Sequence, residues 1–128
     1  MRKPLAVSVL ASLVLLAGVP DVRGQSSGTS RESIEVQMTA KKYAFSPSIV
    51  EVTAGTRIVF KITALDREHG FEIADVKDSC VKIKEGTTVT VEYAAEKPGT
   101  VEFRCCVFCG LGHRGMKGKI VIRPVAPS

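Results

Sequence analysis

The chain has 128 residues, with 18 Lys and Arg against 13 Asp and Glu, and 45% of its residues are hydrophobic. This length suits one domain, and the hydrophobic fraction is large enough to form a core, which excludes an intrinsically disordered chain. The sequence contains no helical repeat, heptad pattern or glycine-rich phosphate loop. Solenoids, coiled coils and nucleotide-binding folds are therefore excluded.

The N-terminus has the pattern of a targeting segment. Arg2 and Lys3 precede an apolar run from Leu5 to Ala17, and small or polar residues follow it, which is the order of a secretory signal. The run is shorter than the roughly 20 apolar residues that span a bilayer. We predict a signal peptide over residues 1–24 and export to the periplasm or an equivalent compartment. If the segment is not cleaved, residues 5–19 would anchor the chain to a membrane.

The charge of the exported chain argues against a nucleic-acid partner. The formal net charge of +5 falls to +3 when residues 1–24, which carry +2, are removed. A charge of this size, without a clustered basic face, is too weak for nucleic-acid binding. Residues 25–33 are polar and rich in Ser and Gly, and we predict a flexible leader there.

From residue 34 onward the sequence is typical of an all-β protein. Short apolar stretches alternate with polar residues at a period of two, and turn residues such as Ala54-Gly55 and Pro98-Gly99 separate them. This pattern predicts a β-sandwich or small barrel. The domain would cover residues 34–124 and contain about eight strands, at residues 34–38, 49–52, 57–63, 69–73, 81–84, 89–93, 100–106 and 119–123.

The residues that can carry chemistry lie mainly between positions 105 and 116. They have the spacing Cys105-x3-Cys109-x3-His113-x2-Met116, and four glycines nearby allow the backbone to bend tightly. Thiolate, imidazole and thioether groups together favour copper over magnesium or calcium. A disulfide between the two cysteines would leave the positions of His113 and Met116 without a reason, so we predict a metal site.

Strand parity indicates which side chains point inward. Cys105 shares a face with Val101 and Phe103, so it should point into the sandwich, whereas Cys106 should point outward. His69 shares parity with Phe71 and Ile73 and should also point inward. It would supply a ligand from a strand distant in the sequence.

The Cys-x3-Cys-x3-His-x2-Met spacing resembles the dinuclear copper A centre of cytochrome c oxidase subunit II and of nitrous oxide reductase. The segment from Lys97 to Cys105 looks like the strand that delivers the ligand cysteine in cupredoxins, and residues 69–73 look like their upstream ligand strand. Residues 43–55 resemble their opening strands. The resemblance implies a cupredoxin-like Greek-key β-sandwich.

The resemblance also implies a role for each matching residue. Cys105 and Cys109 would bridge two copper ions, His69 and Met116 would complete the first, and His113 with the backbone carbonyl of Val107 would complete the second. Such a centre transfers electrons and leaves no coordination position open for a substrate. The implied protein is not an enzyme by itself, and its partner would be a c-type cytochrome or a terminal oxidase or reductase. The sequence also shows no spare carboxylate or histidine beside the loop.

The chain departs from the respiratory oxidase members in three ways. They usually carry Glu at the position of Val107, where it also serves a neighbouring magnesium ion, and they have transmembrane helices and a Trp-containing docking face. This sequence has one short apolar segment and no Trp. The departures favour a free-standing periplasmic copper domain over a standard oxidase subunit.

Two other functions remain compatible with the residues. A mononuclear blue-copper protein would use His69, Cys109, His113 and Met116, and a Cu(I) carrier or metallochaperone could use the same soft ligands. Cys80 and Cys106 also have alternative interpretations: a disulfide between them, a role in copper loading, or two free thiols.

Overall fold

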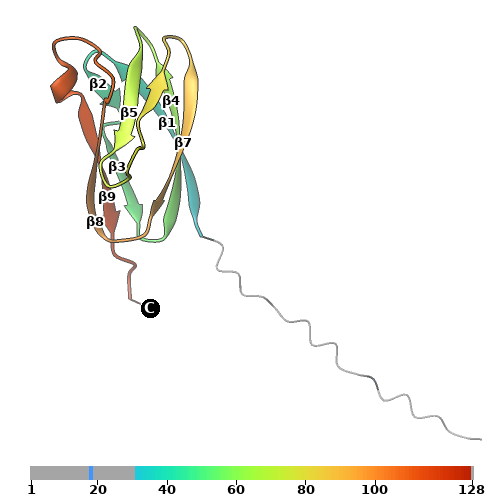
Figure 1. The fold of residues 1–128 in the computed structure, drawn as a ribbon. Coiled ribbons are helices and arrows are strands. Elements are labelled where there is room, and N and C mark those ends of the chain that lie inside the picture. Colours follow the sequence, from blue (N-terminus) through green and yellow to red (C-terminus); the bar gives the residue numbers. More distant parts are fainter. Residues whose placement is uncertain (1–17, 19–30, 128) are drawn as a thin grey trace, which may run out of the picture.

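The computed structural model describes residue 18 and residues 31–127. Within these residues, nine strands form two packed sheets, and one short 3-10 helix, η1 (His113–Gly115), lies near the end of the chain (Figure 1). The first sheet has the order β2-β1-β4-β7 and the second the order β3-β9-β8-β5-β6. The strands are β1 (Ser33–Lys41), β2 (Ala44–Ser46), β3 (Ile49–Thr53), β4 (Thr56–Ala64), β5 (His69–Ile73), β6 (Val81–Ile83), β7 (Thr88–Ala95), β8 (Gly99–Arg104) and β9 (Lys117–Arg123).

Both sheets mix parallel and antiparallel pairs. β1 runs parallel to β4, and β3 runs parallel to β9, whereas β4 with β7 and β8 with β9 are antiparallel. Burial alternates along the strands, most clearly in β4, because successive side chains face the core and the outside in turn. This arrangement confirms the predicted all-β sandwich of the cupredoxin Greek-key type.

Four phenylalanines fill the space between the sheets. Phe45, Phe60, Phe71 and Phe103 are each at most 2% exposed, and their ring centroids lie 5.2 to 6.2 Å apart in tilted or edge-on pairs. Such pairs add to the stabilisation from apolar burial. The cluster joins β2 and β4 to β5 and β8, the strands that deliver His69 and Cys105.

The eight predicted strands are all present; β5 has the predicted bounds, and the other seven have shifted ends. β8 ends at Arg104 and not at Cys106, because the chain turns into a loop after the Cys105 amide bonds the Met116 carbonyl. β2 was not predicted as a separate strand, since its three residues are too few to show a period. Apart from residue 18, the predicted signal peptide lies outside the described residues, as does most of the predicted leader, while Ser33 at the leader's end belongs to β1.

Within residue 18 and residues 31–127, the structure contains no helix with the length and apolar character needed to cross a bilayer.

Replacing Phe60 with Ala should lower the free energy of unfolding by about 3–5 kcal/mol, because it leaves a cavity in the aromatic cluster. Urea denaturation of the metal-free chain would measure the change. The exposed Lys82→Ala variant is the control and should stay within about 0.5 kcal/mol of the unsubstituted chain. A loss below about 1 kcal/mol for Phe60→Ala would contradict a tightly packed cluster.

Candidate metal centre

The loop between β8 and β9 is closed at its base by the backbone. The Cys105 amide donates to the Met116 carbonyl at 3.0 Å, which continues the β8–β9 ladder by one bond. Inside the loop, η1 forms as the Met116 amide bonds the His113 carbonyl at 3.1 Å. The chain therefore leaves the sheet at Cys105 and returns at Met116, and the backbones of these two residues lie side by side.

Tyr43 explains two of the glycines in this loop. A Cβ atom on Gly112 would lie 2.2 Å from the Tyr43 ring, and one on Gly110 would lie 2.4 Å from the Tyr43 hydroxyl. Gly110 also has a φ of 126°, which other residues rarely adopt. Both positions need glycine because the loop backbone packs against this ring.

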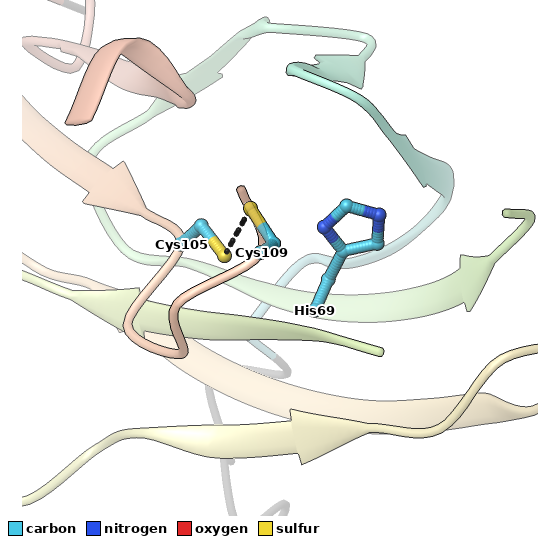
Figure 2. A group of neighbouring side chains, drawn as sticks. All are labelled: His69, Cys105 and Cys109. Carbon is cyan, nitrogen blue, oxygen red and sulfur yellow. Dashed lines mark hydrogen bonds between the residues drawn. The ribbon is translucent and has the colours of Figure 1, made fainter. Parts of the chain in front are cut away.

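The two thiols of the loop face each other at the end of the core. The Cys105 and Cys109 Sγ atoms are 3.6 Å apart, and the residues are 4% and 0% exposed (Figure 2). The Cys109 Sγ also lies 3.7 Å from the Met116 Sδ and 3.8 Å from the His113 Nδ1. Met116 is fully buried, whereas His113 is partly exposed. Three soft or borderline donor atoms thus surround the Cys109 sulfur.

His69 reaches the same cluster from the first residue of β5. Its ring is completely buried, and one ring nitrogen and the two thiol sulfurs lie within 4.8 Å of one another (Figure 2). Among the described residues, its Nδ1 is a buried side-chain nitrogen without a hydrogen-bond partner. A buried polar atom left unpaired is costly, so this nitrogen points to a ligand.

Asp66 holds the other side of the His69 ring. Its Oδ1 lies 2.7 Å from Nε2, and its Oδ2 accepts the Lys42 amide at 2.9 Å. Burial alone would raise the pKa of Asp66, but the hydrogen bonds from His69 and Lys42 lower it below its usual value. The ionised carboxylate can only accept, so Nε2 carries the ring proton and Nδ1 presents its lone pair to the thiols.

Backbone groups also approach the Cys105 sulfur. The Gly70 amide lies 3.3 Å from Sγ and donates to it, and the Val107 carbonyl oxygen lies 3.1 Å away. An amide hydrogen bond stabilises negative charge on sulfur. The predicted carbonyl group is therefore beside the predicted thiol.

Burial is the main influence on the pKa of the Cys109 thiol. Burial, the largest cause, and the nearby Cys105 thiol together raise the pKa of Cys109 to about 11, with Arg67 partly opposing them. The neutral thiol is the stable form in the metal-free chain at neutral pH. A bound cation must displace this proton, as it does at thiolate sites in general.

The donor set fits copper. Two thiols, a thioether and two imidazoles suit a soft or borderline metal, and the unpaired His69 nitrogen provides an open acceptor. The structure brings all six predicted site residues to one end of the sandwich. It confirms the predicted inward orientation of His69 and Cys105.

Two contacts beside the site were missed in the sequence. Asp66 is the carboxylate that the sequence analysis did not find near the loop, although its position three residues before His69 was an available signal. Gly70 contacts Cys105 through its backbone, which no residue pattern shows. Cys106 is bonded to Cys80, so the disulfide, among the three alternatives, is the one that the structure contains.

The fold and the donor set define a class of copper proteins, and similarity to known proteins agrees with this class. The sequence model of the cupredoxin-like domain family matches residues 8–122. The chain therefore belongs to the cupredoxin-like family.

Within this family, the chain is related to an oxidase subunit. It is 36% identical over 95 residues to cytochrome c oxidase subunit 2 of Thermus thermophilus, covering 74% of this chain and 70% of that protein. It is 28% identical to nitrous-oxide reductase of Stutzerimonas stutzeri, covering 71% of this chain but 15% of the reductase. A heme-copper terminal oxidase structure aligns with a TM-score of 0.66 and 26% identity, over 76% of this chain and 68% of that one.

Replacing Asp66 with Ala should remove the preference of His69 for the Nε2-protonated form, because the carboxylate that accepts this proton is lost. Nitrogen-15 chemical shifts of the metal-free chain would show one tautomer in the unsubstituted protein and a mixture in the variant. Asp66→Asn is the conservative control, since its amide oxygen can still accept. An unchanged tautomer in Asp66→Ala would show that Asp66 does not orient the ring.

Proposed function

We propose that the chain is an exported electron-transfer protein with a dinuclear copper A-type centre. The observation that carries the proposal is the pair of buried, facing thiols of Cys105 and Cys109, surrounded by further donor atoms. These two thiols form no disulfide and have further donor atoms around them. This arrangement matches the ligand pattern of the copper A centre, which the sequence resembles. The relatives among oxidase and reductase subunits support the same function.

The proposed ligands divide between two metal ions. Cys105 and Cys109 would bridge them, His69 and Met116 would belong to the first ion, and His113 with the Val107 carbonyl would belong to the second. When bound, the centre supplies a reversible one-electron change. The chain holds its donors in place before metal arrives, through the β5 and β8 strands and the Asp66–His69 hydrogen bond.

Burial of the donors favours electron transfer over copper carriage. Cys109, Met116 and His69 are fully buried and lie at the ends of strands or in a loop closed by the backbone. A carrier must hand over its ion, which requires donors that are exposed and able to move. Donor atoms that are already fixed before a metal ion binds would also need little rearrangement when the charge of the centre changes during electron transfer.

The facing thiols also favour two ions over one. A mononuclear blue-copper site would use Cys109 and leave the Cys105 thiol unused at 3.6 Å from it. Two bridging thiolates account for both cysteines.

Copper content and electron paramagnetic resonance of the purified, copper-loaded chain test the proposal. We expect two copper ions per chain and hyperfine structure shared equally by both nuclei. One ion with a single-nucleus pattern would assign the blue-copper class. Bound Cu(I) that resists oxidation would assign the carrier.

Cys105→Ser and Cys109→Ser should each abolish the two-copper spectrum, because each removes one bridge. The same spectra and metal analyses measure this. For a mononuclear site, Cys105→Ser would keep the full native spectrum, and that result would exclude the dinuclear centre. Lys97→Ala is a control for handling and loading, since Lys97 is exposed in the turn before β8, at the end of that strand opposite to Cys105.

We also propose that a redox protein, such as a c-type cytochrome or a terminal oxidase, approaches the metal loop. Phe108 and Leu111 are 72% and 99% exposed. The Phe108 ring lies 5.9 Å from the His113 ring, the least buried of the proposed side-chain ligands. Large apolar side chains exposed on a loop are of the kind that protein partners cover. A partner docked there would lie beside His113, one of the proposed ligands.

Leu111→Glu should slow electron exchange with a reduced soluble c-type cytochrome several-fold and leave the copper spectrum unchanged. Stopped-flow absorbance at several ionic strengths measures the rate. Val125→Glu is the matched control, since Val125 is an exposed apolar residue after β9, away from the loop. Equal rates for both variants would place the contact elsewhere.

A further inference from the structure

The end of β5 that carries His69 lacks a full strand partner on one side. β5 pairs with β8 through Glu72↔Arg104 and Ile73↔Phe103 only. Continuing this antiparallel register places Gly70 opposite Cys106, beyond the end of β8. At this level the Gly70 amide bonds the Cys105 sulfur and not a backbone carbonyl. The ladder that would hold His69 beside the loop is therefore missing.

The Cys80–Cys106 disulfide spans this part of the sheet. Cys106 belongs to the metal loop, and Cys80 directly precedes β6, which pairs with the other edge of β5 from His69 to Phe71. The bond thus connects the segments that flank the ligand end of β5.

The disulfide lies directly against Gly70. A Cβ atom at Gly70 would be 2.6 Å from the Cys106 Sγ and 2.8 Å from the Val107 amide nitrogen. Only a residue without a side chain allows the loop and its disulfide to approach β5 this closely. The contact continues from the disulfide through Gly70 to the neighbouring residue, His69.

We propose that the Cys80–Cys106 disulfide is a covalent clasp that positions His69 against the thiol loop. It replaces the missing ladder between β5 and β8 at the level of the metal centre. Its effect on copper rests on the proposed function. Cys80 and Cys106 are positioning residues and do not themselves bind copper.

A cleft beside the disulfide is lined by residues of the metal loop. A cleft of about 550 Å³ has both disulfide cysteines in its wall together with Cys105 and His113. Cys80 is exposed, and Cys106 is partly buried. If the loop separates from β5, this cleft deepens toward the donors and admits water or a competing ligand. The clasp should therefore slow copper loss.

The double variant Cys80→Ser with Cys106→Ser tests the proposal through the rate of copper transfer to an excess of a water-soluble Cu(I) chelator. We expect transfer at least about tenfold faster than in the unsubstituted chain, the lower end of the effect of losing a supporting contact at a metal site. Val52→Ala creates a cavity near the end of β3, away from the loop. It is the control for general destabilisation, and both melting temperatures are measured.

Two results would overturn the clasp. In one, the transfer rates follow only the melting temperatures, so that Val52→Ala releases copper as fast as an equally destabilised double variant. In the other, Cys80→Ser alone transfers copper faster, while Cys106→Ser and the double variant transfer it at the same rate as the unsubstituted chain. That result would mean that the bond merely keeps the Cys106 thiol away from copper. The clasp requires faster transfer in all three variants.

Hydrogen exchange of the metal-free chain separates this proposal from the copper assignment. The amides of Gly70 and Phe71 should exchange faster in the double serine variant than in Val52→Ala at matched stability. If the unsubstituted chain binds no copper, the proposed function fails, and exchange still decides whether the disulfide holds β5. Equal exchange in the two variants would overturn the clasp.

Discussion

The structure depends on keeping soft donor atoms together at the apolar end of a β-sandwich. Two thiols and an imidazole nitrogen lie within 4.8 Å of one another, and all three residues are buried. Among the described residues, the imidazole nitrogen has no hydrogen-bond partner. Burial without compensation costs free energy, so this arrangement needs support from the surrounding fold.

That support comes from segments far apart in the sequence. His69 comes from β5, and the two cysteines come from the loop after β8, while Phe71 and Phe103 on the same strands join the aromatic cluster below. The inward alternation of each strand delivers a donor at its end and an aromatic ring two residues away. The same packing therefore stabilises the sandwich and sets the separation of the donors.

Sequence reasoning was sufficient where one local rule decided the result. The period of two predicted eight strands, and parity predicted the inward orientation of His69 and Cys105. It was insufficient where a contact depends on tertiary placement. The three residues of β2 are too few for a period, and the Cys80–Cys106 pairing depends on how the loop lies over Gly70. Asp66 lies far in the sequence from the cysteine loop, and its contact with the site depends on how the turn between β4 and β5 places it against His69.

Burial of the loop cysteines affects how long they stay reduced in an oxidising compartment. An oxidising compartment favours disulfides, yet Cys109 has no exposed surface in the folded chain. An oxidising protein can reach it only when the segment between Cys105 and Met116 opens. Local opening has its own free energy, which differs from that of global unfolding. The lifetime of the metal-free thiols is thus governed by the opening equilibrium of this one loop.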